Sequence, residues 1–276
     1  MESQGSFSVD PTDPRAPAQD EWDCMTPGER ERVVSSLPIQ PPADQQAPDE
    51  CRHLNTGITA RQALDVFFKR TGRDIYVSSG LNVYYPGEPR FAPDVLAVLD
   101  VERRQRLRWV VSQEGKGLDL VIELHIEGHQ EKDRRRNRQR YAALGIQEYF
   151  LFDCTDLRLE GHRLAGGSAM YEAIAPGEGR IRSEVLGLDL ALDGPKLRFL
   201  HGSDTIPEAE ELIEKLGNMV NALSTRHRSE VNRAAAQAAR FHKASQLAVA
   251  AGLKVAELER DLAALRSQVD RTKRGS

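Results

Sequence analysis

Residues 117–153 constrain the fold more than any other part of this chain. The first part, residues 118–126, is apolar and β-branched enough to form a strand that is buried on both faces. A basic segment at about residues 130–144 follows and is typical of a helix, because Gly145 stands where a helix end favours a positive φ. The aromatic run at residues 148–152 is a second buried strand. Strand, helix and strand at this spacing predict a right-handed crossover between parallel strands.

The first of these strands carries polar side chains that a buried strand rarely tolerates. Asp119, Glu123 and His125 occupy alternate positions and therefore point to the same face of the strand. Carboxylates are seldom buried without a partner. We therefore expect this face to carry a site, although Asp119 alone is also explained as a cap of the strand entry.

Another apolar strand is expected over residues 90–100. Pro93 directly precedes Asp94, at a place where a strand needs no backbone donor. If this strand pairs with the one that carries Glu123, the carboxylates of Asp94 and Glu123 meet.

These residues resemble the Uma-type restriction endonuclease family, which belongs to the PD-(D/E)XK nuclease superfamily. The motifs that carry the resemblance are Pro93-Asp94, Asp119-Leu120-Val121-Ile122-Glu123, Asp133 with Tyr141, Gly145-Ile146-Gln147-Glu148-Tyr149 and Phe152-Asp153. Their order and spacing are more specific than any one of them. The resemblance implies a restriction endonuclease-like α/β fold, in which helices flank a mixed β-sheet core.

The resemblance also implies a DNA endonuclease that depends on Mg²⁺, or on Mn²⁺ in its place. Asp94 and Glu123 would then be the catalytic metal ligands, with the backbone carbonyl of Leu124 beside them. Glu50 is the nearest candidate for an auxiliary acid at the start of the first core helix. The alternative is that Glu50 is a solvated residue at the helix start, where its negative charge interacts favourably with the positive end of the helix dipole.

The chain departs from the superfamily pattern where a catalytic lysine is expected. His125 stands two residues after Glu123, and Asn137 stands at the corresponding position on the following helix. An asparagine can orient water but lacks the positive charge that stabilises the transition state. Three alternatives stay open: His125 acts as the base, Arg136 or Arg138 reaches inward, or the fold binds without cutting.

The basic helix is the candidate surface for nucleic acid. A net charge of −4 means that any contact with DNA must come from a local cluster. The cluster consists of Lys132, Arg134, Arg135, Arg136 and Arg138. Such residues either neutralise phosphates or form a solvated charged face.

The chain is expected to contain three regions. Residues 1–49 are rich in proline and acidic residues, so we expect a mostly disordered arm with a helical patch near residues 27–37. Residues 50–203 form the nuclease-like domain, which ends in a β appendage whose short strands alternate with glycine turns. Residues 204–276 form a helical, coiled-coil tail.

Apolar residues recur every three or four positions in the tail. They are Ala244, Ala248, Ala251, Val255, Leu258, Leu262, Leu265 and Val269. This is the spacing of a heptad seam, although its alanines and Gly252 weaken it. We expect a homodimer through residues 244–269 or packing on another partner. The rival to the nuclease is thus a degraded nuclease fold that binds nucleic acid or protein and oligomerises through this helix.

The expected location is the cytoplasm. Cys24, Cys51 and Cys154 are odd in number and widely spaced, which favours reduced thiols. The first residues lack the basic start and apolar run of a signal peptide. No stretch approaches the roughly eighteen apolar residues that a membrane span needs, so we expect no membrane partner.

Overall fold

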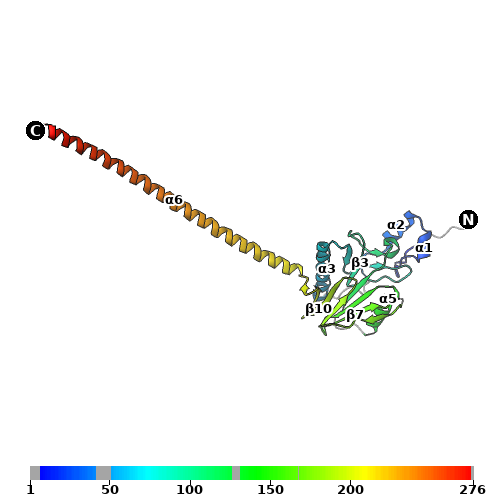
Figure 1. The fold of residues 1–276 in the computed structure, drawn as a ribbon. Coiled ribbons are helices and arrows are strands. Elements are labelled where there is room, and N and C mark those ends of the chain that lie inside the picture. The colour runs from blue at the N-terminus through cyan, green and yellow to red at the C-terminus, as the bar shows by residue number, and fades with distance from the viewer. Residues whose placement is uncertain (1–6, 42–50, 126–130, 167, 275–276) are drawn as a thin grey trace. The chain divides into compact units, whose positions relative to one another are not determined.

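The structure of the protein is a computed structural model that describes residues 7–41, 51–125, 131–166 and 168–274. The chain divides into two units, Met1–Glu210 and Glu211–Ser276. The first unit is mixed α/β, and the second is helical (Figure 1). In the described ranges, no helix has the length and apolar character that a membrane crossing requires.

A six-stranded sheet forms the centre of the first unit, in the order β1-β3-β5-β6-β7-β8. The strands are β1 (Ile75–Ser78), β3 (Val95–Leu99), β5 (Leu120–His125), β6 (Glu148–Asp153), β7 (Arg158–Leu164) and β8 (Tyr171–Ala173). β5 and β6 are parallel, and the other neighbours in this sheet are antiparallel. Helix α5 (Glu131–Ala143) connects β5 to β6, and Gly145 follows it with a φ of 76°. The predicted mixed sheet and its crossover helix are therefore confirmed.

Two smaller sheets accompany the central one. The four-stranded sheet has the order β12-β11-β10-β9, and the two-stranded sheet pairs β2 with β4. Their strands are β2 (Val83–Tyr84), β4 (Trp109–Val110), β9 (Arg180–Ser183), β10 (Leu188–Asp193), β11 (Lys196–His201) and β12 (Asp204–Thr205). A short helix, α4 (Val111–Glu114), follows β4 directly. The four-stranded sheet is the predicted β appendage.

The two faces of the central sheet pack against different elements. Helix α3 (Cys51–Thr71) and the four-stranded sheet cover one face (Figure 1). Leu64 and Phe68 of α3 and Phe199 of β11 belong to the buried cluster on this face. On the other face, Val121 of β5 belongs to a buried cluster with Tyr141 of α5. Because side chains alternate along β5, Glu123 points to this second face, under α5.

Residues 7–41 differ from the mostly disordered arm that their composition predicts. They contain α1 (Gln19–Cys24) and α2 (Pro27–Ser36), and α2 is the helical patch expected there. Ala16 and Leu37 are buried in one cluster with Tyr84 and Val110. The guanidinium of Arg108 donates to the carbonyls of Val34 and Leu37 at the end of α2. A few well-placed apolar contacts therefore hold this segment on β2 and β4, while residues 42–49 lie outside the described residues.

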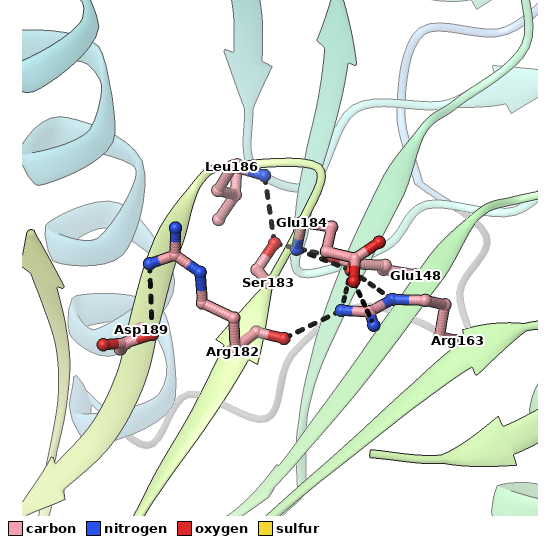
Figure 2. A network of polar contacts seen from close by, with 7 residues as sticks. All are labelled: Glu148, Arg163, Arg182, Ser183, Glu184, Leu186 and Asp189. Atoms are coloured by element: carbon pink, nitrogen blue, oxygen red, sulfur yellow. Dashed lines mark hydrogen bonds and ion pairs between the residues drawn. The ribbon is translucent and has the colours of Figure 1, made fainter. Parts of the chain in front are cut away.

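Glu148, at the start of β6, links the central sheet to the four-stranded sheet (Figure 2). Its buried carboxylate accepts hydrogen bonds from Arg163 of β7 at 2.9 Å and from the backbone N–H of Glu184 at 2.8 Å. The Ser183 hydroxyl of β9 donates to its other oxygen. The carboxylate is therefore shared by β6, β7 and β9 and serves the packing of the two sheets.

The second unit consists of helix α6 (Ala209–Arg274), which is 66 residues long. Large apolar side chains along it are exposed, including Ile213, Phe241 and Leu258. Over the described side chains of α6, the buried stripe that stabilises most helices of globular proteins is absent.

Candidate active site

Asp94 and Glu123 lie opposite each other where β3 and β5 meet. The antiparallel register pairs Val95 with Ile122, so one further step along both strands sets Asp94 against Glu123. Two hydrogen bonds fix this arrangement. The backbone N–H of Leu124 donates to Asp94 Oδ2 at 2.7 Å, and the backbone N–H of Asp94 lies 3.4 Å from Glu123 Oε2. The strand pairing therefore brings the two carboxylates together.

Glu123 is buried, with 9% of the residue's surface exposed. Burial raises the pKa of Glu123 well above its ordinary value, and the negative charge of Asp94 raises it further. A hydrogen bond from Tyr141 acts in the opposite direction but does not outweigh these two effects. When both are ionised, the paired carboxylates repel each other in a poorly solvated site, and a cation between them would relieve that repulsion.

The donor set of this pair fits a hard divalent cation. Mg²⁺ prefers oxygen ligands, and one or two carboxylates are enough when water or phosphate oxygens complete the shell. Within the described residues, no three or more His, Cys, Asp or Glu side chains gather in a way that could hold a metal ion. A metal at Asp94 and Glu123 would therefore need oxygens from outside the side chains, such as the carbonyl of Leu124.

Tyr141 connects the crossover helix to this pair. Its phenol donates a hydrogen bond to Glu123 Oε1. The ring is buried between Phe91 and Tyr149, with centroid distances of 5.4 Å and 5.5 Å. The sequence analysis includes Tyr141 in a motif with Asp133 but predicts no role for it. Its spacing from Asp133 is the only feature of the sequence that singles out Tyr141.

Helix α3 passes close to the carboxylate pair at Gly57. A Cβ atom at Gly57 would lie 3.5 Å from the carbonyl oxygen of Asp94 and 3.6 Å from Cδ1 of Leu124. The helix therefore packs directly on the backbone that presents both acids. Glu50, the predicted auxiliary acid, precedes this helix and lies outside the described residues.

The arginines of α5 differ in their contacts. Arg135, Arg136 and Arg138 are all exposed, and Arg138 also has a partner on a neighbouring strand. Arg138 Nη1 lies 3.2 Å from Nε2 of His162 on β7, and burial and the charge of Arg138 lower the pKa of His162. Lys132 and Arg134 belong to α5, but their side chains are outside the described part of the structure. Arg138 therefore reaches toward β7. This differs from the alternative in which Arg138 reaches inward and supplies, at the carboxylates, the positive charge of the missing lysine.

Comparison with known proteins assigns the family. The family model "Uma2: Putative restriction endonuclease" matches residues 43–193, which is more than half of the 276 residues. The chain belongs to the Uma2 family. The matched residues include Asp94, Glu123 and Tyr141, and the resemblance drawn from the sequence motifs is confirmed.

A solved structure is also similar to this Uma2 protein. It is the crystal structure of a putative nuclease belonging to DUF820 from Anabaena variabilis ATCC 29413. The similarity covers 51% of this chain and 76% of that chain, with 12% sequence identity and a TM-score of 0.40. The sequence matches no curated protein.

His125 and Asn137 of this Uma2 chain stand at the two positions where a catalytic lysine is expected from the sequence. His125 is buried at the end of β5, on the same face as Glu123 and paired in register with Asp153. Asn137 is half-buried on α5, one turn before Tyr141. Both side chains therefore belong to elements that form the carboxylate site.

Proposed function

We propose that this Uma2 protein is a Mg²⁺-dependent DNA endonuclease that hydrolyses phosphodiester bonds. The observation that carries the proposal is the meeting of Asp94 with Glu123, whose pKa is raised by burial and then by the charge of Asp94. Membership of a family described as restriction endonucleases supports the same reaction class.

Asp94, Glu123 and the carbonyl of Leu124 would hold the metal in this proposal. Bound Mg²⁺, or Mn²⁺ in its place, supplies a water of lowered pKa and neutralises charge on the phosphate. The chain itself orients the ligands, because Tyr141 donates to Glu123 and the Leu124 N–H donates to Asp94. Glu50, which precedes α3 in the sequence, is the proposed auxiliary acid.

His125 is the proposed proton acceptor, with Asn137 as a residue that orients water. An imidazole can accept a proton near neutral pH, and a carboxamide cannot. We expect His125→Ala to lower the single-turnover cleavage rate at least 100-fold. Asn137→Ala should lower it by less than about tenfold, and the reverse order would exchange the two roles.

The proposed DNA surface is α5, through Lys132, Arg134, Arg135, Arg136 and Arg138. Arg135, Arg136 and Arg138 support this role, because they are exposed on the helix that also carries Tyr141. Phosphate contacts from such residues position a duplex without reading its sequence.

Plasmid cleavage tests the proposal. Purified protein with supercoiled plasmid and Mg²⁺ or Mn²⁺ should nick or linearise the DNA, and Asp94→Ala should not. Asp65→Ala is the matched control, because Asp65 pairs with Lys69 on the surface of α3. Equal cleavage by wild type and Asp94→Ala would overturn the site assignment.

A protein that binds without cutting is the second candidate. Asn137 at the expected lysine position and the contact of Arg138 with His162 favour it. Calorimetry separates the two candidates, because a binder would show no uptake of Mg²⁺ at millimolar concentration while it keeps its affinity for DNA.

We also propose a homodimer that forms through residues 244–269.

A further inference from the structure

Helix α6 carries an unbroken seven-residue repeat that is longer than the seam expected at residues 244–269. The first core position of each repeat holds Ile213, Val220, His227, Ala234, Phe241, Ala248, Val255 and Leu262. The second holds Leu216, Leu223, Glu230, Gln237, Ala244, Ala251, Leu258 and Leu265. No insertion shifts the phase, so one stripe runs along nearly the whole helix.

This stripe is exposed in the single chain. Ile213 and Phe241 are each 69% exposed, and Leu265 is 61% exposed. The exposed residues Met219, Val231 and Leu247 flank the stripe, and only Val249 and Leu253 among the large apolar residues of the described α6 lie away from it. A helix with such a stripe needs a partner to bury it.

We propose that α6 forms a parallel, in-register, two-stranded coiled coil with a second copy of this chain. Both ends of the stripe have β-branched residues at the first core position, Ile213 and Val220 at one end and Val255 at the other. Leucine occupies the second core position in the same repeats. Parallel coiled coils with this combination favour two strands.

The charges beside the stripe complement each other in the parallel arrangement. In a parallel coiled coil, the residue directly before a first core position on one helix lies beside a residue of the other helix. That second residue is five positions later in the sequence. Asp261 would therefore face Arg266 of the second copy, and Lys254 would face Glu259. Lys254 also pairs with Glu257 of its own helix at 2.7 Å, so the Asp261–Arg266 pair is the clearer signal.

The middle of the stripe selects the register. His227, Glu230 and Gln237 occupy core positions there, where apolar residues would be more stabilising. An in-register pair sets each polar residue against its own counterpart, and a shifted pair would set them against the apolar ends. Polar core residues therefore penalise other alignments at some cost in stability.

The parallel arrangement has a consequence for cleavage that rests on the proposed function. Each helix follows its own nuclease unit in the chain. The two units are therefore joined to the same end of the coiled coil. Two active sites on one duplex could each cut one strand, so the dimer should linearise plasmid more readily than a monomer would.

Mass and cross-linking test the dimer without any need for cleavage. Light scattering of the full chain should give twice the chain mass of 30.8 kDa. With the native cysteines replaced by serine, Ala244→Cys and Ala251→Cys should each form an interchain disulfide on oxidation. Ala250→Cys, at an outward position, is the matched control and should not.

Each other outcome overturns a part of the inference. A monomer mass at micromolar concentration would overturn the dimer, and three or more chains would overturn the two strands. Cross-linking at only one of positions 244 and 251 would indicate an antiparallel pair. Because neither readout uses DNA, the nuclease proposal can fail while the dimer stands.

A charge exchange tests the alignment. Arg266→Asp should weaken the dimer by about tenfold, because it sets like charges against each other on both sides of the coiled coil. The double variant Asp261→Arg/Arg266→Asp should restore the dissociation constant to within about twofold of wild type. If the double variant is as weak as the single one, the residues do not face each other.

Discussion

The phenol of Tyr141 on α5 donates a hydrogen bond to the carboxylate of Glu123 on β5. It joins the crossover helix to the acid whose pKa is raised by burial and by Asp94. The orientation of one proposed metal ligand therefore depends on how α5 packs over the sheet. Partners of this kind hold a ligand in place and tune its affinity for metal.

Replacement of Tyr141 by Phe keeps the ring packing and removes the donor. We expect the Mg²⁺ concentration needed for half-maximal cleavage to rise about tenfold, because Glu123 is less well oriented. Plasmid cleavage over a Mg²⁺ titration measures this. Tyr171→Phe is the control, since the Tyr171 hydroxyl donates to the Ile146 carbonyl at 2.8 Å instead. The same Mg²⁺ requirement in both variants would contradict the role of Tyr141.

Glu123→Gln should stabilise the metal-free protein more at about pH 8 than at about pH 5. The pKa of Glu123 is higher in the folded protein than in the unfolded chain. The contribution of Glu123 to the free energy of unfolding is therefore fully present below the ordinary carboxyl pKa of about 4.3. It is lost as pH rises through the folded pKa. Glutamine removes this loss. Urea unfolding in EDTA measures the difference between variant and wild type, and an equal difference at both pH values would show that the carboxyl is not perturbed.

Glu148→Ala should lower the free energy of unfolding by roughly 3 kcal/mol, because it leaves Arg163, Ser183 and a backbone N–H without their shared acceptor. The matched control is Glu184→Ala. Its carboxylate also pairs with Arg163, but its side chain is 70% exposed, so we expect a loss below about 1 kcal/mol. Urea midpoints compare the two, and similar losses would remove the special role of Glu148 in joining the sheets.

Loss of Arg135 and Arg136 should weaken DNA binding at every sequence. Each phosphate contact contributes about 0.9 to the slope of log affinity against log salt, so Arg135→Ala/Arg136→Ala should reduce that slope by nearly two. Fluorescence anisotropy with a labelled duplex at several salt concentrations measures this. Arg32→Ala, on α2, should leave the slope unchanged. An unchanged slope in the double variant would indicate a solvated helix face.

The centre of the fold could be predicted because its signals are local. The apolar strands around residues 120–125 and 148–153, the basic helix between them and Gly145 each follow from a short stretch of sequence. The meeting of Asp94 and Glu123 followed from one added assumption, that their strands pair. The register of β3 on β5 satisfies it.

What could not be predicted depends on contacts between distant residues. Glu148 has partners between 15 and 36 residues away, and Arg108 contacts a carbonyl 74 residues earlier. Composition shows that residues 7–41 are polar overall, but it does not show that Ala16 and Leu37 fit a cluster with Tyr84. The role of Tyr141 likewise appears only when α5 lies over β5.

A crystal soaked in Mn²⁺ tests most directly whether Asp94 and Glu123 share one divalent ion. We expect a single anomalous peak about 2.1 Å from an oxygen of each carboxylate. The peak should disappear in Asp94→Asn crystals that otherwise keep the wild-type structure. No peak at the wild-type pair, or a peak that contacts neither residue, would contradict the proposed metal site.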